Sequence, residues 1–270
     1  MNSLVPTYPI IAEHPTRPVV LRFDALSHRY FACGTGDDGC TDAAELVSVT
    51  TWVKRNFDPF DAPAIAARVA ARDGRSTADV LADWEYKRND AAERGTRVHE
   101  TAEDAILDRA PRHDPRDDRE RAMFAAAWQA VQDMRDAGYE FIAAEFPVFS
   151  ERLGLAGTID LMARDGNGAL LMLDWKTNES IDADPKYGNP HGLGACAAVP
   201  DCNLYHYAMQ LATYETIIHT EGYTAEPFRK SLLHVTTAGV TPIDLPDVGE
   251  VVARALLDYR INGESLNTPF

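Results

Sequence analysis

The chain has 270 residues and a formal net charge of −16, and 45% of its residues are hydrophobic. This length is sufficient for one compact domain with a sizeable core. No apolar run is long enough for a signal peptide or a membrane span, so we expect a soluble cytoplasmic protein, whether its gene is cellular, viral or phage-borne. Four cysteines are too few for a disulfide framework in a chain of this length.

Residues 1–75 are predicted to form an accessory region of short strands and helices. Its turn-forming residues and apolar runs alternate over short distances, as in hairpins. The expected elements are two strands within residues 19–31, an exposed loop at 33–42, a strand at 46–49, a helix capped by Thr50 or Thr51, and an alanine-rich helix that ends near Gly74.

The next helix, capped by Ser76 or Thr77, carries the first candidate site residue. Apolar side chains recur along it at helical spacing, from Val80 to Ile106. His99 lies on this helix, and Gly95 stands one turn earlier on the same face. The missing side chain of Gly95 leaves room for a backbone or a ligand to approach.

Residues 109–121 are charged and interrupted by prolines, and they are predicted to form a solvated linker. A helix at 123–137 and a strand at 141–149 follow. Pro147 favours an outer position for this strand. Glu145, at its middle, is a candidate third acid, and Glu140 and Glu151 are its competitors.

A predicted β-hairpin holds the central candidate residues. Two apolar runs at 158–162 and 169–173 flank the turn-forming residues 165–168. Asp160 interrupts the first run, while Asp174 and Lys176 end the second and point to the same face. Two carboxylates beside a dry sheet require a cation, and a divalent metal with a nearby lysine suits phosphodiester hydrolysis. An ordinary Asp–Lys ion pair at a strand end is the simpler interpretation.

After the hairpin, residues 178–201 form a long irregular stretch, which is either a loop that covers the cleft or a flexible surface insertion. A helix is predicted at 203–219. Tyr207, Gln210 and Tyr214 form one stripe on it, beside an apolar stripe. Two strands, at 231–235 and 240–243, and a helix at 248–259 complete the chain.

Taken in order, these features form a five-part pattern: Gly95 to His99 (G-x-x-x-H), Glu145, Gly157 to Asp160 (G-x-x-D), Asp174 to Lys176 (D-x-K) and Gln210 to Tyr214 (Q-x-x-x-Y). From about Ser48 to His219 the chain resembles the RecB-type branch of the PD-(D/E)XK nuclease superfamily. That branch includes the RecB nuclease domain, the CRISPR-adaptation nucleases and the mitochondrial genome-maintenance exonuclease. The resemblance implies an α/β, restriction-endonuclease-like core in residues 76–270. Its small mixed central sheet is flanked by helices and carries the N-terminal helical and hairpin additions.

The resemblance also implies roles for the site residues. His99, Asp160, Asp174 and the backbone carbonyl of Trp175 are the expected ligands of Mg²⁺ or Mn²⁺, and the mixed N/O set suits manganese somewhat better. Asp160, Asp174, Lys176 and Glu145 are the expected catalytic residues. Gly95, Gln210, Tyr214 and Tyr207 are expected to support the site or contact the substrate.

The implied function is a metal-dependent deoxyribonuclease, namely an exonuclease that prefers single-stranded or frayed DNA ends in repair, recombination or replication. A helicase or recombination protein is the expected partner besides DNA, because the chain has no G-x-x-x-x-G-K-[ST] loop, and no membrane contact is expected. A non-catalytic nucleic-acid-binding subunit and a site-specific endonuclease are the alternatives. The formal charge of −16 counts against a protein that handles nucleic acid, but bound metals reverse the local field and one basic groove can coexist with an acidic remainder.

The cysteines do not follow the pattern of those branch members that hold an iron–sulfur cluster. Cys33 and Cys40 are separated by six residues, Cys196 and Cys202 by five, and no cysteine follows Cys202. Without C-x-x-C spacing we expect no iron–sulfur cluster. A zinc ion shared by all four cysteines is the alternative.

Overall fold

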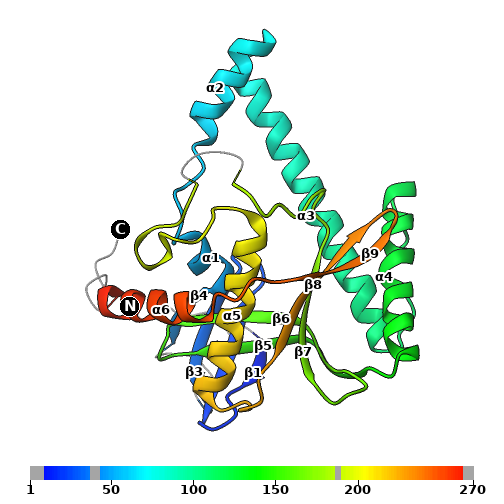
Figure 1. Cartoon of the computed structure of the whole chain (residues 1–270), viewed down its shortest axis with the longest axis vertical. Helices are drawn as coiled ribbons and strands as arrows, with labels where there is room; N and C mark the ends of the chain where they lie inside the picture. The colour runs from blue at the N-terminus through cyan, green and yellow to red at the C-terminus, as the bar shows by residue number, and fades with distance from the viewer. Residues whose placement is uncertain (1–8, 37–42, 186–189, 264–270) are drawn as a thin grey trace.

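The computed structural model describes residues 9–36, 43–185 and 190–263, and in these ranges nine strands form one mixed sheet (Figure 1). The hydrogen-bonded order is β1-β2-β3-β4-β6-β7-β8-β9, and β5 pairs with β6. Two neighbouring pairs, β4 with β6 and β7 with β8, are parallel, and the others are antiparallel. The strands are β1 (Ile10–Glu13), β2 (Val19–Asp24), β3 (Arg29–Gly34), β4 (Ala44–Ser48), β5 (Glu140–Ser150), β6 (Leu155–Arg164), β7 (Leu170–Lys176), β8 (Arg229–Thr236) and β9 (Gly239–Asp244).

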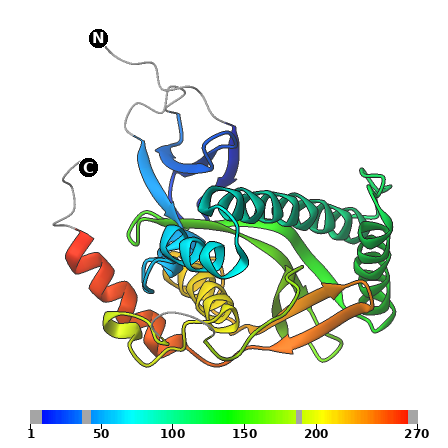
Figure 2. The same cartoon turned by 90° about the horizontal axis from the view of Figure 1, so that it is seen from above.

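Helices cover both faces of this sheet (Figures 1 and 2). They are α1 (Val49–Lys54), α2 (Ala62–Asp73), α3 (Thr77–Ile106), α4 (Asp118–Asp136), α5 (Asn203–Glu221) and α6 (Gly249–Gly263), with a short 3₁₀ helix η1 at Gly194–Cys196. The predicted architecture, a mixed central sheet flanked by helices with N-terminal additions, is confirmed. None of the described helices combines the length and the apolarity that a membrane crossing requires.

Two hydrophobic cores pack against β7 from opposite sides. Met172 belongs to the core formed with α1, α5 and α6, whereas Leu171 and Leu173 belong to the core formed with α3 and α4. This alternation is the period of two that a strand imposes on its side chains. Six of the seven residues of β7 are buried, because the strand is covered on both faces.

The N-terminal strands continue the central sheet. β4 runs parallel to β6, with Val47 opposite Leu155 and Ser48 opposite Ala156. Helix α1 begins directly after β4 and buries Trp52 and Val53 in the core with α5. The predicted cap of this helix, Thr50 or Thr51, is wrong: Ser48 is the N-cap, and its Oγ accepts a hydrogen bond from the Thr51 amide. Ser48 is the cap because it directly precedes Val49, the first helical residue, whereas Thr50 and Thr51 lie inside the helix.

Helices α2 and α3 form an arm that projects from the sheet (Figure 1). Ser76 caps α3 by accepting a hydrogen bond from the Asp79 amide, as predicted. Ala66 and Ala70 of α2 pack against Val80 of α3 in a small core of their own. The other end of α3 packs on α4, so one 30-residue helix joins the arm to the sheet.

The stretch after β7 is irregular at residues 178–185, as predicted, residues 186–189 lie outside the described residues, and residues 190–201 are more ordered than their composition predicted. Within residues 190–201, His191 pairs with Pro200 and the short helix η1 forms. Cys196 and Val199 are buried in the core with α5 and α6. This part is therefore packed against the domain rather than standing off it as a flexible insertion.

The prediction of a solvated linker at 109–121 is wrong for Arg112, Arg116 and the beginning of α4. Glu120, in the first turn of α4, is fully buried and accepts hydrogen bonds from Arg97 Nε at 3.1 Å and from the Arg116 amide at 2.6 Å. Burial raises the pKa of Glu120, but these bonds outweigh it and hold the pKa below its ordinary value. The charges are therefore paired between α3 and α4 instead of being solvated.

We expect Glu120→Ala to lower the free energy of unfolding by about 2–4 kcal/mol, because Arg97 and Arg116 lose their shared carboxylate. Asp118→Ala is the matched control, since Asp118 is an acid in the same helical turn with a fully exposed side chain. Its expected change is within about 0.5 kcal/mol. Urea denaturation of both variants measures the difference, and equal stability would contradict the account.

Candidate functional site

Three predicted site residues from three elements meet at one point. His99 of α3, Glu145 of β5 and Asp160 of β6 each offer a ligand atom, and these atoms lie within 4.8 Å of one another. His99 Nδ1 is 3.3 Å from Asp160 Oδ2. Both side chains are only partly exposed, His99 at 26% and Asp160 at 11%. One imidazole and two carboxylates thus form a mixed N/O set of the kind that binds divalent metals.

Glu145 reaches this point because β5 and β6 change the face that they bury. Ile159 and Leu161 are two residues apart, so a regular strand would place both on one face. Instead Ile159 packs with α5, and Leu161 packs with α3 and α4. Ala144 and Phe146 of β5 switch in the same way.

At the switch, Glu145 lies opposite Asp160, since the neighbouring pairs are Ala144 with Leu161 and Phe146 with Ile159. Glu145 has a φ of +48°, a left-handed conformation that costs energy for a residue with a side chain. The two other acids considered for this position lie away from the cluster. Glu140 starts β5 opposite Arg164, and Glu151 forms an ion pair with Arg17.

Asp174 lies beside this cluster but is held by other partners. It is 2% exposed, and its Oδ1 accepts a hydrogen bond from Gln210 Nε2 at 3.2 Å. Gln210 Nε2 also donates to the hydroxyl oxygen of Tyr214 at 3.3 Å. Asp174 Oδ2 forms an ion pair with Lys176 Nζ. Gln210 on α5 therefore contacts Asp174 directly, and Tyr214, four residues later, contacts Gln210.

Tyr207 and Trp175 contact the other candidate residues. Lys176 Nζ lies 4.6 Å from the ring centroid of Tyr207, a cation–π contact. The Tyr207 hydroxyl donates to Asn178 Oδ1 at 2.8 Å. The amide of Trp175 donates to Asp160 Oδ2 at 2.8 Å, which ties β7 to β6 at the cluster.

Two glycines permit close approaches around the site. A Cβ at Gly157 would lie 2.6 Å from Cε1 of Tyr214, so the tyrosine ring occupies the space of the missing side chain. The sequence pattern contained Gly157, but its role depends on the distant Tyr214. A Cβ at Gly95 would lie 3.1 Å from Thr177 Oγ1, and the room predicted there admits the chain that leaves β7.

The crowded carboxylates have raised pKa values. Burial, followed by the charges of Asp160, Glu103, Asp174 and Glu100, raises the pKa of Glu145 to about 8. Burial also raises the pKa of Asp174, and the opposing effect of Lys176 limits the rise to about 6. Burial lowers the pKa of Lys176, but Asp174 and Asp160 outweigh it and keep the ammonium charged. The site therefore carries more negative charge than its single lysine balances.

Tyr30 of β3 approaches the site from the N-terminal strands, and no motif predicted this position. Burial and then the charge of Glu145 raise the pKa of its hydroxyl, while the Thr158 side chain acts in the opposite direction. Only the pairing of β4 with β3 and β6 brings Tyr30 near Glu145.

A divalent cation fits this donor set. The three clustered ligand atoms are of types that Mg²⁺ and Mn²⁺ accept, and their excess negative charge has no protein partner that neutralises it. The buried carboxylate of Asp174, held by Lys176 and Gln210, is a further acceptor beside the cluster.

The cysteines are not members of this cluster. Cys33 is disulfide-bonded, and Cys196 and Cys202 are buried free thiols. Burial raises the pKa of Cys196 to about 11, which disfavours the thiolate form that metals bind. Cys40 lies outside the described residues.

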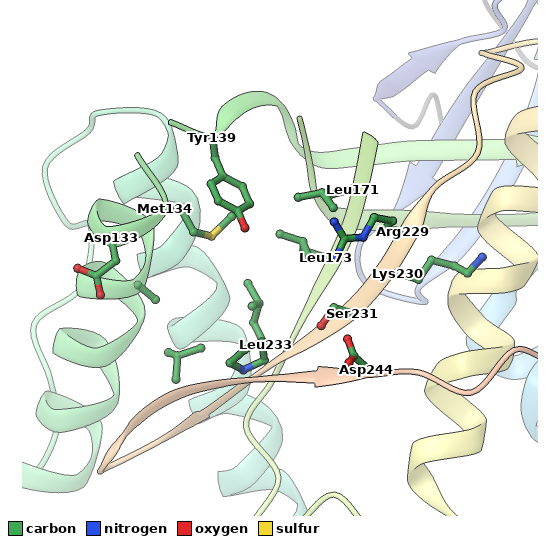
Figure 3. Close-up of a pocket in the computed structure, with 13 residues that line it drawn as sticks. Asp133, Met134, Tyr139, Leu171, Leu173, Arg229, Lys230, Ser231, Leu233 and Asp244 are labelled. Carbon is green, nitrogen blue, oxygen red and sulfur yellow. The ribbon is translucent and has the colours of Figure 1, made fainter. Parts of the chain in front are cut away.

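A separate hollow of about 350 Å³ lies between α4 and the strands β7 to β9 (Figure 3). Leu171, Leu173 and Leu233 line it. The cations in its wall are neutralised, Arg229 by Asp165 and Lys230 by Glu215. None of the residues of the cluster lines this hollow.

Comparison with known proteins gives one match. The model of the PD-(D/E)XK nuclease superfamily matches residues 75–258, a range that contains the cluster, Asp174, Lys176, Gln210 and Tyr214. No curated protein matches the chain significantly.

We expect Gly157→Ala to lower the free energy of unfolding by about 1–3 kcal/mol, because the new methyl group overlaps the Tyr214 ring. Gly34→Ala is the matched control, since a Cβ at Gly34 would meet nothing within 4 Å. Chemical denaturation compares the two variants. A Gly157→Ala protein as stable as the Gly34→Ala protein would show that the Tyr214 ring does not need this space.

Proposed function

The chain belongs to the PD-(D/E)XK nuclease superfamily, and from this premise we propose that it is a Mg²⁺- or Mn²⁺-dependent deoxyribonuclease. Family membership indicates a metal-dependent nuclease with a nucleic-acid substrate. The observation that carries the rest of the proposal is the meeting of His99, Glu145 and Asp160 beside the Asp174–Lys176 pair. Acids, imidazole and ammonium at one point are the groups that phosphodiester hydrolysis uses.

His99, Glu145, Asp160 and Asp174 would hold the cation, and the Trp175 carbonyl stays a proposed additional ligand. When bound, a divalent cation polarises the phosphate and lowers the pKa of a water molecule. Glu145 differs here from its expected role: we assign it to the metal ligands, because its carboxylate lies in the cluster.

Lys176 acts on the attacking water and on the charge that develops on the phosphate. Its ammonium is held by Asp174 and lies over Tyr207, so its direction is fixed before substrate arrives. Gln210 and Tyr214 keep Asp174 oriented through their hydrogen bonds. Low solvent exposure strengthens each of these interactions.

The finer parts of the proposal are the RecB-type branch, exonuclease action on single-stranded or frayed ends, and work in DNA repair, recombination or replication. The ordered five-part pattern supports the branch, because His99, Gln210 and Tyr214 lie at or beside the same site. A helicase or recombination partner, a cytoplasmic location and the domain division after residue 75 belong to the same proposal.

Two alternatives predict different behaviour. A non-catalytic binding subunit would bind DNA without cleaving it, but Lys176, paired with Asp174 beside the acidic cluster, favours an active enzyme. A site-specific endonuclease would cut closed circular DNA at defined positions. A cleavage assay on end-labelled oligonucleotides and on closed circular DNA distinguishes both alternatives from an exonuclease.

We expect Lys176→Met to reduce cleavage of single-stranded oligonucleotides by about 10²–10³-fold, because the charge that stabilises the developing oxyanion is lost. Lys230→Met is the matched control. Lys230 lies on β8, the strand next to β7, and it forms a similar ion pair with Glu215 of α5. Oligonucleotides labelled at the 5′ or the 3′ end, with Mn²⁺, also reveal the polarity. Equal cleavage by the two variants would contradict the role of Lys176.

Metal affinity should rise with pH, because protons compete with the cation for Glu145 and Asp174, whose pKa values are about 8 and about 6. Between pH 6.5 and 7.5 Asp174 is already largely ionised, and Glu145 must release its proton to bind. The dissociation constant for Mn²⁺ should therefore fall by about tenfold over this unit and level off above about pH 8. Titration calorimetry measures it, and Glu145→Gln should flatten the dependence. A constant affinity in the parent protein would exclude Glu145 as a ligand.

A further inference from the structure

A groove runs from the site along the arm. It consists of two hollows of about 540 and 440 Å³ that share Arg119, Thr177, Asn178 and Glu179. The first hollow is walled by the stretch of α3 from Tyr86 to Arg94. The second continues past the beginning of α4 to the turn between β8 and β9. We name these two hollows together the arm groove.

The arm groove begins one residue beyond Lys176. Thr177, which is shared by both hollows, touches the helix at Gly95, and His99 lies one turn further along α3. A chain molecule whose phosphate reaches Lys176 and His99 would therefore have the groove directly beside it. The two hollows share four lining residues, so a polymer can pass from one to the other.

The groove contains cations without carboxylate partners, although the whole chain is strongly acidic. Lys87 and Arg119 are exposed, and neither forms an ion pair within the described part of the chain. Arg94, in contrast, is committed to Asp117 at 2.9 Å. Lys87 and Arg119 therefore keep their charge available for phosphate, which is the dominant source of affinity for nucleic acid.

The groove also presents an aromatic ring. Tyr86 is 74% exposed and precedes Lys87. An exposed ring next to a cation is the combination that single-strand-binding surfaces use, because a base stacks on the ring while a phosphate meets the cation. Stacking requires a base whose face is free, so a single strand is favoured over a duplex.

We propose that the arm groove binds a single-stranded segment of nucleic acid that continues from the scissile phosphate. The proposal rests on the nuclease function and assigns the substrate path to Tyr86, Lys87 and Arg119. Two acids also line the groove. Asp90 is paired with Arg94 and Arg116, whereas Glu179 has no cation partner among the described residues and weakens binding.

The test is binding of a fluorescein-labelled 20-nucleotide oligo(dT) in EDTA, measured by anisotropy over a range of salt concentrations. Lys87→Ala with Arg119→Ala should raise the dissociation constant by about tenfold and reduce the slope of log K against log salt by about 1.4, the release expected for two single-strand phosphates. Tyr86→Ala should raise it by about fivefold or more, and Glu179→Gln should lower it.

Arg152→Ala with Arg254→Ala is the control, because it removes the same charge from exposed positions outside the groove. No binding by the parent, or equal affinity of the two double variants, overturns the groove assignment. If the groove variants lose affinity for duplex DNA as much as they lose it for the single strand in the same assay, the assignment to a single strand is overturned. A parent that binds in this way but cleaves nothing with Mn²⁺ contradicts the proposed function and leaves the groove in place.

Discussion

The crowding of Glu145 against Asp160 is the constraint on which the rest of the structure depends. β5 and β6 each pass from one core to the other at these residues, so Ile159 is buried with α5 and Leu161 with α3 and α4. Anchored on both sides, the strands cannot relax to separate the acids, and Glu145 keeps a left-handed backbone and a pKa near 8. The two cores thus supply the energy that holds an unfavourable group of charges together.

The surrounding elements act on this one point. α3 adds the imidazole of His99, β7 adds Lys176 and a backbone amide, and α5 fixes Asp174 through Gln210. Gly157 allows α5 to come close enough for the Tyr214 ring to fill the space beside β6. The single lysine leaves an excess of negative charge, which a divalent cation would balance. The other buried acids of the described chain are each paired with arginine, Glu120 by Arg97 and Arg116, Asp104 by Arg112 and Glu221 by Arg17, so a buried excess of negative charge is particular to the site.

The sequence predicted what local spacing determines. Asp174 and Lys176 share a strand face and Gln210 and Tyr214 a helix face, because these relations follow from periods of two and about four residues. It did not predict the position of Tyr30, the role of Gly157 or the backbone of Glu145, since each depends on segments far apart in the chain. Part of the charged stretch at 109–121 was misinterpreted for the same reason: the partners of Arg112 and Arg116 lie on α3 and α4, and composition alone indicated solvent.

His99, Glu145 and Asp160 are proposed to assemble around a cation. Anomalous diffraction at the manganese edge from crystals soaked in MnCl₂ shows directly whether they do. We expect an anomalous difference peak for manganese within coordination distance of His99, Glu145 and Asp160, with Asp174 adjacent. Crystals that show no peak there, or manganese only at other acidic side chains, would contradict it.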